Sequence, residues 1–162
     1  MKKTGEQMVE LYKDFAKSYD LISIEDPFDQ DDWANYSKLT KEIGKDVQIV
    51  GDDLLVTNPK RIMDGIKNKA CNALLLKVNQ IGTLSDAVET IETAQRHGYD
   101  PVVSHRSGDT CDWHIAHLAV AFKCPIIKTG VVEGARIAKI NELIRTEHFL
   151  ANRAKIADLK IR

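Results

Sequence analysis

The stretch Ala73-Leu74-Leu75-Leu76-Lys77 decides the fold, because it is an apolar run that ends in a charged residue and precedes a helix-like segment. This arrangement occurs five times, with the polar end residues spaced 23 to 28 residues apart. Such a rhythm is typical of parallel β/α units, whose strands are apolar on both faces because helices cover them. The sequence therefore predicts an α/β fold with five parallel strands, at residues 21–25, 47–52, 73–77, 101–105 and 125–128.

Helix-like segments flank every predicted strand. Thr4 and Gln7 form a predicted capping box, in which each side chain accepts a hydrogen bond from the other residue's backbone. Asn58-Pro59 combines an N-cap residue with a residue suited to the first helical position. The chain after His148 fits either an extended helix or a frayed end. The predicted helices cover about residues 6–18, 31–43, 59–67, 84–97, 110–122 and 135–147.

The composition bounds the class of protein. The 162 residues suffice for a real hydrophobic core, and we predict a single domain over residues 1–162. The 23 basic and 24 acidic residues nearly cancel, so we expect no nucleic-acid partner. Apolar runs are strand-sized, so no membrane span is expected. The start has no apolar secretory signal and the three cysteines are scattered, which indicates a reducing, cytoplasmic location.

Each predicted strand ends in a residue that can take part in chemistry. In (β/α) barrels the carboxyl ends of the strands form the rim on which active sites are built. The rim predicted here carries two carboxylates, two lysines and a histidine, which suggests a metal-assisted enzyme acting on a small anion. These residues are Glu25, Asp52, Lys77, His105 and Lys128.

Glu25 and Asp52 are the candidate metal ligands. Carboxylates at neighbouring strand ends are hard oxygen donors, which suit Mg²⁺. Either carboxylate alone would be better explained as a helix cap or as part of a surface turn. Together, at matching positions of two strands, they favour a metal.

Lys77 is the candidate general base. A lysine embedded in a leucine-rich strand loses solvation, which favours its neutral, proton-accepting form. A second ammonium group at Lys128 would strengthen this effect. The residues around Lys77 leave open the alternative of a lysine that reaches out of the sheet to solvent.

The segment Ser104-His105-Arg106-Ser107-Gly108 joins a predicted strand to a predicted helix. Hydroxyl groups, a guanidinium and the N-terminus of the following helix suit a phosphate group. Ordinary loop chemistry is the alternative explanation for these polar residues.

Cys111, His114 and His117 have the side chains of metal ligands, but their spacing argues against a shared ion. Steps of three residues on a helix leave the end members about 120° apart, so they do not converge. We expect exposed or half-buried helix residues here instead of a metal site.

Several segments resemble motifs of the enolase family, and they follow one another in the family's order. The resemblance extends from Thr4 to about Glu147 and is highly specific, because the motifs are long. The matching segments are Ile22-Ser23-Ile24-Glu25-Asp26-Pro27-Phe28, Val50-Gly51-Asp52-Asp53-Leu54, Leu74-Leu75-Leu76-Lys77-Val78-Asn79-Gln80-Ile81-Gly82-Thr83, Ser104-His105-Arg106-Ser107-Gly108 and Ile127-Lys128-Thr129-Gly130.

The resemblance implies an activity and a cofactor. Enolases carry out the Mg²⁺-dependent dehydration of 2-phosphoglycerate to phosphoenolpyruvate in glycolysis and gluconeogenesis. By resemblance, Glu25 and Asp52 are two ligands of Mg²⁺, and Lys77 is the base that removes the proton from C2 of the substrate. Lys128 is implied to face the substrate carboxylate.

The resemblance also implies a substrate loop. Arg106 and Ser107 are implied phosphate contacts, and Ser104 and His105 belong to the same loop. One local departure lies nearby, where Glu133-Gly134-Ala135-Arg136 stands in place of the family's Arg-Ser-Glu-Arg.

Only the last five strands of the enolase barrel are matched, so the resemblance implies a partial TIM-type (β/α) barrel. The family's amino-terminal domain, first barrel strands, third carboxylate ligand and general acid are expected to be absent. The isolated chain is therefore expected to be weakly active or inactive, and to form a homo-oligomer or join a complementary enolase segment. The alternative is a non-catalytic, enolase-derived protein that binds full-length enolase or another partner.

Overall fold

The computed structural model describes residues 2–158, which form two compact units, one up to Asp100 and one from Pro101 onward. The prediction of a single domain over residues 1–162 stays a prediction. None of the helices in the described part has the length and apolarity needed to cross a membrane. The first unit contains α1 (Gly5–Ser18), β1 (Ser23–Glu25), α2 (Trp33–Ile43), β2 (Gln48–Gly51), α3 (Pro59–Asn68), β3 (Ala73–Leu76), α4 (Val78–Ile81) and α5 (Leu84–Arg96).

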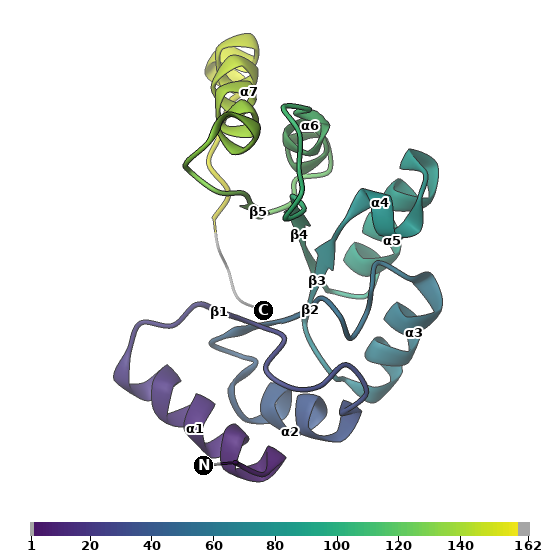
Figure 1. Cartoon of the computed structure of the whole chain (residues 1–162), viewed down its shortest axis with the longest axis vertical. Helices are drawn as coiled ribbons and strands as arrows, with labels where there is room; N and C mark the ends of the chain where they lie inside the picture. Colours follow the sequence, from purple (N-terminus) through teal and green to yellow (C-terminus); the bar gives the residue numbers. More distant parts are fainter. Residues whose placement is uncertain (1, 159–162) are drawn as a thin grey trace. The chain divides into compact units, whose positions relative to one another are not determined.

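The second unit continues the alternation of strands and helices, which can be followed along the chain in Figure 1. It contains β4 (Asp100–Ser104) except for its first residue, α6 (His114–Ala121), β5 (Ile126–Lys128), α7 (Gly134–Leu150) and the 3₁₀ helix η1 (Ala151–Arg153). The predicted α/β class with five strands, each followed by a helix, is thereby confirmed.

The strands pair in parallel within each unit. In the first unit β1 pairs with β2, and β2 pairs with β3, with Glu25 opposite Val50 and Gly51 opposite Leu74. In the second unit β4 pairs with β5, with Ser104 opposite Lys128. Parallel pairing brings the carboxyl ends of neighbouring strands to the same edge, where the candidate site residues stand.

Apolar side chains on both faces of the strands build the core of the first unit. Every residue of β2 and β3 is buried, as expected for strands covered by helices. Helices α1, α2, α3 and α5 add buried side chains from their inner faces. These helical core residues are Val9, Tyr36, Leu39, Ile62, Ala87, Ile91 and Ala94.

The predicted helix starts are confirmed at two helices. Both hydrogen bonds of the capping box between Thr4 and Gln7 are present at the start of α1. The side chain of Asn58 accepts hydrogen bonds from the backbone N–H groups of Lys60 and Arg61, and Pro59 is the first residue of α3. The chain after His148 continues as helix to Leu150 and then as η1, which answers the question left open there.

The prediction of a helix starting at residue 110 is wrong, because α6 begins at His114. The side chains before it bond to the backbone instead. Thr110 Oγ1 accepts a hydrogen bond from the N–H of Asp112, and Asp112 Oδ1 accepts one from the N–H of His114. Such local bonds compete with helical ones and delay the helix start.

The side chain of Asn72, which precedes β3, forms hydrogen bonds with the backbone around the start of β2. Its Oδ1 accepts a hydrogen bond of 2.7 Å from the N–H of Ile49, and its Nδ2 donates to the carbonyl oxygens of Gly44 and Val47. One side chain therefore satisfies three backbone groups around the start of β2.

Replacing Asn72 by Ala leaves the buried N–H of Ile49 without this acceptor. We expect the free energy of unfolding to fall by about 1–3 kcal/mol, which is the usual cost of an unsatisfied buried polar group. Urea unfolding followed by circular dichroism measures the change. The control Asn68→Ala alters an exposed asparagine and should change the stability by no more than about 0.5 kcal/mol. Equal stabilities of the two variants would contradict the bridging role of Asn72.

Candidate functional site

Three of the predicted site residues stand at neighbouring strand ends in the first unit. Glu25 is the last residue of β1, Asp52 directly follows β2, and Lys77 directly follows β3. β2 ends at Gly51 and β3 at Leu76, one residue earlier than predicted. Asp52 and Lys77 therefore lie in the connections to the following helices. Because the three strands are parallel and adjacent, their ends bring these residues to one edge.

The structure joins Asp52 and Lys77 in an ion pair. Lys77 Nζ lies 2.5 Å from Asp52 Oδ2, and the side chains are only 14% and 9% exposed. Lys77 therefore turns toward Asp52 and does not reach out to solvent, which decides between the two alternatives left open for this lysine.

Asp52 is held in conditions that disfavour its charge. Burial raises the pKa of Asp52, and the ammonium of Lys77 opposes this change without cancelling it. The carboxylates of Asp26 and Glu25 raise the pKa of Asp52 further by like-charge repulsion. A carboxylate in this position gains from any additional positive charge brought to it.

One oxygen of Asp52 is well suited to a cation. Asp52 Oδ1 is buried and has no hydrogen-bond partner among the described residues, whereas Oδ2 is paired with Lys77. Buried polar atoms usually have a partner, and an exception at a strand end points to a ligand. The charge of Glu25 also acts on Asp52. Glu25 is exposed, and both side chains offer the oxygen donors that hard divalent cations prefer.

Asp26 was missed by the sequence reasoning. It belongs to a group of three carboxylates, with Asp52 and Asp53, whose oxygens lie within 4.8 Å of one another. Both Asp26 oxygens are already used, because they accept hydrogen bonds of 2.9 Å from the N–H groups of Asp52 and Asp53. The hydroxyl of Tyr36 donates a further bond of 2.8 Å. Asp26 thus fixes the backbone that carries Asp52.

A second support holds the backbone of Lys77. Thr57 is fully buried, and its Oγ1 accepts a hydrogen bond of 3.0 Å from the N–H of Lys77. The same hydroxyl contacts Gln80 Oε1 at 2.9 Å. Thr57 has a φ of 54°, in the left-handed region that a threonine seldom adopts. The connection after β2 therefore takes an unusual conformation that places this hydroxyl beside Lys77.

The second unit brings together Ser104, His105 and Lys128. Ser104 stands opposite Lys128 in the pairing of β4 and β5. The N–H of His105 donates a hydrogen bond of 3.0 Å to the carbonyl oxygen of Lys128, and Ser104 Oγ donates one of 2.9 Å to the carbonyl of His105. Arg106 and Ser107 follow in the loop, where Ser107 is exposed and Arg106 is half-buried.

His105 lies in electropositive surroundings. Burial and the positive charge of Arg136 lower the pKa of His105, whereas the carboxylate of Asp109 opposes them. Lys128 and Lys139 add further positive charge. His105 Nδ1 is buried without a hydrogen-bond partner among the described residues. A neutral imidazole surrounded by cations suits an anionic ligand, as the sequence predicted for this loop.

The residues Cys111, His114 and His117 do not form a cluster in the described part of the chain. Cys111 is exposed and precedes α6, so it does not share the helix as predicted. His114 Nδ1 contacts Asp112 Oδ1 at 2.5 Å, and His117 Nε2 contacts Glu142 Oε1 at 2.7 Å. The two histidines thus bond to different carboxylates.

Replacing Asp26 by Ala removes the acceptor for two backbone N–H groups. We expect the amide hydrogens of Asp52 and Asp53 to exchange roughly 10- to 100-fold faster, because hydrogen bonds to charged groups contribute about 1.5–3 kcal/mol each. Hydrogen exchange followed by NMR measures both amides. The control Asp46→Ala removes an exposed carboxylate of the same unit and should leave the two rates unchanged. Unchanged rates in Asp26→Ala would refute the supporting role.

Comparison with known proteins identifies the family. Residues 1–162 match the family described as enolase, C-terminal TIM barrel domain. The chain is 52% identical over 160 residues to an enolase of Solanum lycopersicum, and equally to enolase 2 of Hevea brasiliensis. Each match covers 98% of this chain but 36% of the relative, so the chain spans about a third of the length of these curated relatives. The predicted partial TIM-type barrel is thereby confirmed, and the chain belongs to the enolase family.

Proposed function

We propose that the site carries out the reaction of enolases, the Mg²⁺-dependent dehydration of 2-phosphoglycerate to phosphoenolpyruvate. The observation that carries the proposal is the largely buried ion pair between Lys77 and Asp52, which lie at the ends of two paired strands and are the proposed base and a proposed metal ligand. The reaction would belong to glycolysis and gluconeogenesis in the cytoplasm. Pairing of a lysine base with Mg²⁺ is a known arrangement of the enolase superfamily.

The first unit would supply the metal site and the base. Glu25 and Asp52 would hold Mg²⁺, which when bound supplies positive charge against the charge developing on the substrate carboxylate. Lys77 would take the proton from C2 of 2-phosphoglycerate. The contact with Asp52 supports this role only through position, because it holds the Lys77 side chain beside the proposed metal ligand.

The second unit would supply the contacts to the substrate's anionic groups. Arg106 and Ser107 would bind the phosphate, with Ser104 and His105 in the same loop, and Lys128 would face the carboxylate. The electropositive surroundings of His105 support this assignment, because a phosphate is stabilised by several cations at once.

The proposed activity depends on groups that these residues do not supply. The 162 residues contain no counterpart that we recognise of the family's general acid or third carboxylate ligand. We therefore propose that a complementary enolase segment supplies these groups, whereas a homo-oligomer would cover exposed strand edges without supplying them. The edge position of β1, which pairs with β2 in the first unit, suits such an added strand. No contact among the described residues favours the alternative of a non-catalytic interaction protein.

Metal binding tests the assignment of Asp52. We expect calorimetric titration with Mg²⁺ to show weak binding by the unaltered chain, and at least about tenfold weaker binding by Asp52→Asn. Losing even an outer-shell partner of a metal costs about 10–100-fold in affinity, and loss of a ligand should cost no less. Asp46→Asn is the control, since it removes one exposed negative charge of the same unit. Equal affinities of Asp52→Asn and the unaltered chain would place the metal elsewhere.

Turnover tests the assignment of Lys77. We expect the purified chain alone to convert 2-phosphoglycerate about 10²–10⁴-fold more slowly than an ordinary enolase, which is the usual cost of a missing acid–base group. The ultraviolet absorbance of phosphoenolpyruvate follows the reaction. Residual turnover should disappear in Lys77→Ala and persist in Lys41→Ala, an exposed lysine of α2. Residual turnover that survives Lys77→Ala would exclude Lys77 as the base.

A further inference from the structure

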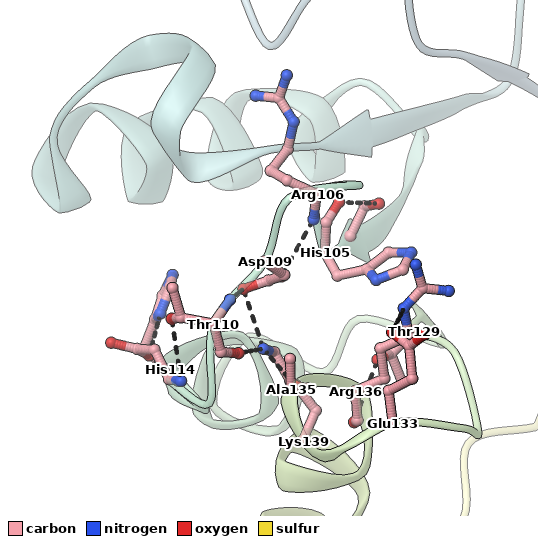
Figure 2. A network of polar contacts seen from close by, with 12 residues as sticks. His105, Arg106, Asp109, Thr110, His114, Thr129, Glu133, Ala135, Arg136 and Lys139 are labelled. Carbon is pink, nitrogen blue, oxygen red and sulfur yellow. Dashed lines mark hydrogen bonds and ion pairs between the residues drawn. The ribbon is translucent and has the colours of Figure 1, made fainter.

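Lys139 is a buried lysine of the second unit. Its side chain is only 1% exposed, although it belongs to α7. Its ammonium donates to Thr110 O at 2.5 Å and Ala135 O at 2.8 Å, and lies 3.0 Å from Asp109 Oδ1. Figure 2 shows these contacts meeting at the ammonium. An ammonium has three N–H donors, so each has an acceptor here.

Asp109 links this lysine to the loop that carries the proposed phosphate contacts. Its Oδ2 accepts a hydrogen bond of 3.1 Å from the N–H of Arg106, and its Oδ1 accepts one of 2.7 Å from the N–H of Thr110. Burial alone would raise the pKa of Asp109, but these two N–H groups and Lys139 together lower it. The carboxylate is therefore charged and closes the turn from Arg106 to Thr110.

Packing offers little support at the tip of this loop. Ser107 and Gly108 are exposed, and a Cβ placed on Gly108 would meet no described atom within 4 Å. The polar contacts of Asp109 and Lys139 restrain this segment from the side of α7.

We infer that Asp109 and Lys139 are positioning residues, which fix the loop of residues 105–110 so that Arg106 and Ser107 are held ready for a phosphate group. Neither residue needs to touch the ligand. Asp109 acts on the backbone N–H of Arg106, and Lys139 holds Asp109 and the carbonyl of Thr110 against the first turn of α7. The inference rests on the proposed function for the identity of the ligand, while the loop restraint itself rests on the contacts.

The effect of removing one partner follows from the burial of the pair. Without Lys139, the Asp109 carboxylate and the Thr110 carbonyl lose a hydrogen-bond donor in a partly buried position. The loop must then change its conformation so that water can hydrate these two groups. Without the charge of Asp109, the Lys139 ammonium loses its only anionic partner among its three acceptors. Because both substitutions break the same ion pair, their effects on the loop should not add.

The test uses the whole chain and inorganic phosphate as the probe. NMR titration gives the dissociation constant, and hydrogen exchange gives the opening of the Arg106 and Thr110 amides. In Lys139→Met and in the shape-conserving Asp109→Asn we expect about tenfold weaker phosphate binding and about tenfold faster exchange of both amides. The double variant should resemble the single ones. Lys155→Met, which neutralises an exposed lysine of the same unit, should behave like the unaltered chain.

The outcomes test two separate claims: that Asp109 and Lys139 position the loop, and that the loop binds phosphate. Faster exchange spread evenly over the second unit would show a merely structural role and overturn the inference, as would unchanged Arg106 exchange in Asp109→Asn. A loosened loop with unchanged phosphate affinity would also overturn it. If the unaltered chain binds phosphate no better than Arg106→Ala does, the proposed function fails at this loop, and the exchange rates still decide whether the pair restrains it.

Discussion

Charged side chains that leave water must find partners, and this constraint organises both units. Moving a carboxylate or an ammonium into the protein costs several kcal/mol unless ion pairs and hydrogen bonds compensate. Asp26 meets the requirement with two backbone N–H groups and a tyrosine hydroxyl, and Lys139 meets it with a carboxylate and two carbonyls. In both cases some of the compensating groups belong to the segments that carry the candidate site residues, namely the N–H groups of Asp52 and Asp53 and the loop residues Asp109 and Thr110. The partners needed for burial therefore also set the conformation of the connections after the strands.

Two buried side-chain atoms among the described residues break this rule, and both belong to the candidate site. Asp52 Oδ1 and His105 Nδ1 have no hydrogen-bond partner. Their surroundings differ, since Asp52 lies near two other carboxylates besides its partner Lys77, whereas mainly cations act on His105. An unpartnered oxygen among carboxylates suits a cation, and an unpartnered nitrogen among cations suits an anion. In each unit the proposed ligand would therefore supply a partner for one unpartnered buried atom.

The sequence predicted what depends on local pattern and failed where distant segments decide. Apolar runs ending in polar residues placed all five strands, because parallel strands need apolar side chains on both faces. The start of α6 was misplaced, since side-chain bonds of Thr110 and Asp112 compete with the helix. The roles of Asp26 and Lys139 could not be read from spacing, because their partners lie as many as 27 and 30 residues away. An aspartate beside a predicted ligand and a lysine on a helix look like ordinary surface residues.

Folding shifts the pKa values of Asp109 and Asp52 in opposite directions. The pKa of Asp109 is lowered by folding, so its contribution to stability is complete above the ordinary value of 3.8 and is lost as the pH falls through the lowered value. The pKa of Asp52 is raised by folding, so its charged form weakens the fold at pH values above the raised pKa, and protonation relieves that cost. The charged form of Asp109 therefore stabilises the folded state. The charged form of Asp52 opposes folding in spite of the contact with Lys77, and a cation bound to Asp52 would offset that cost.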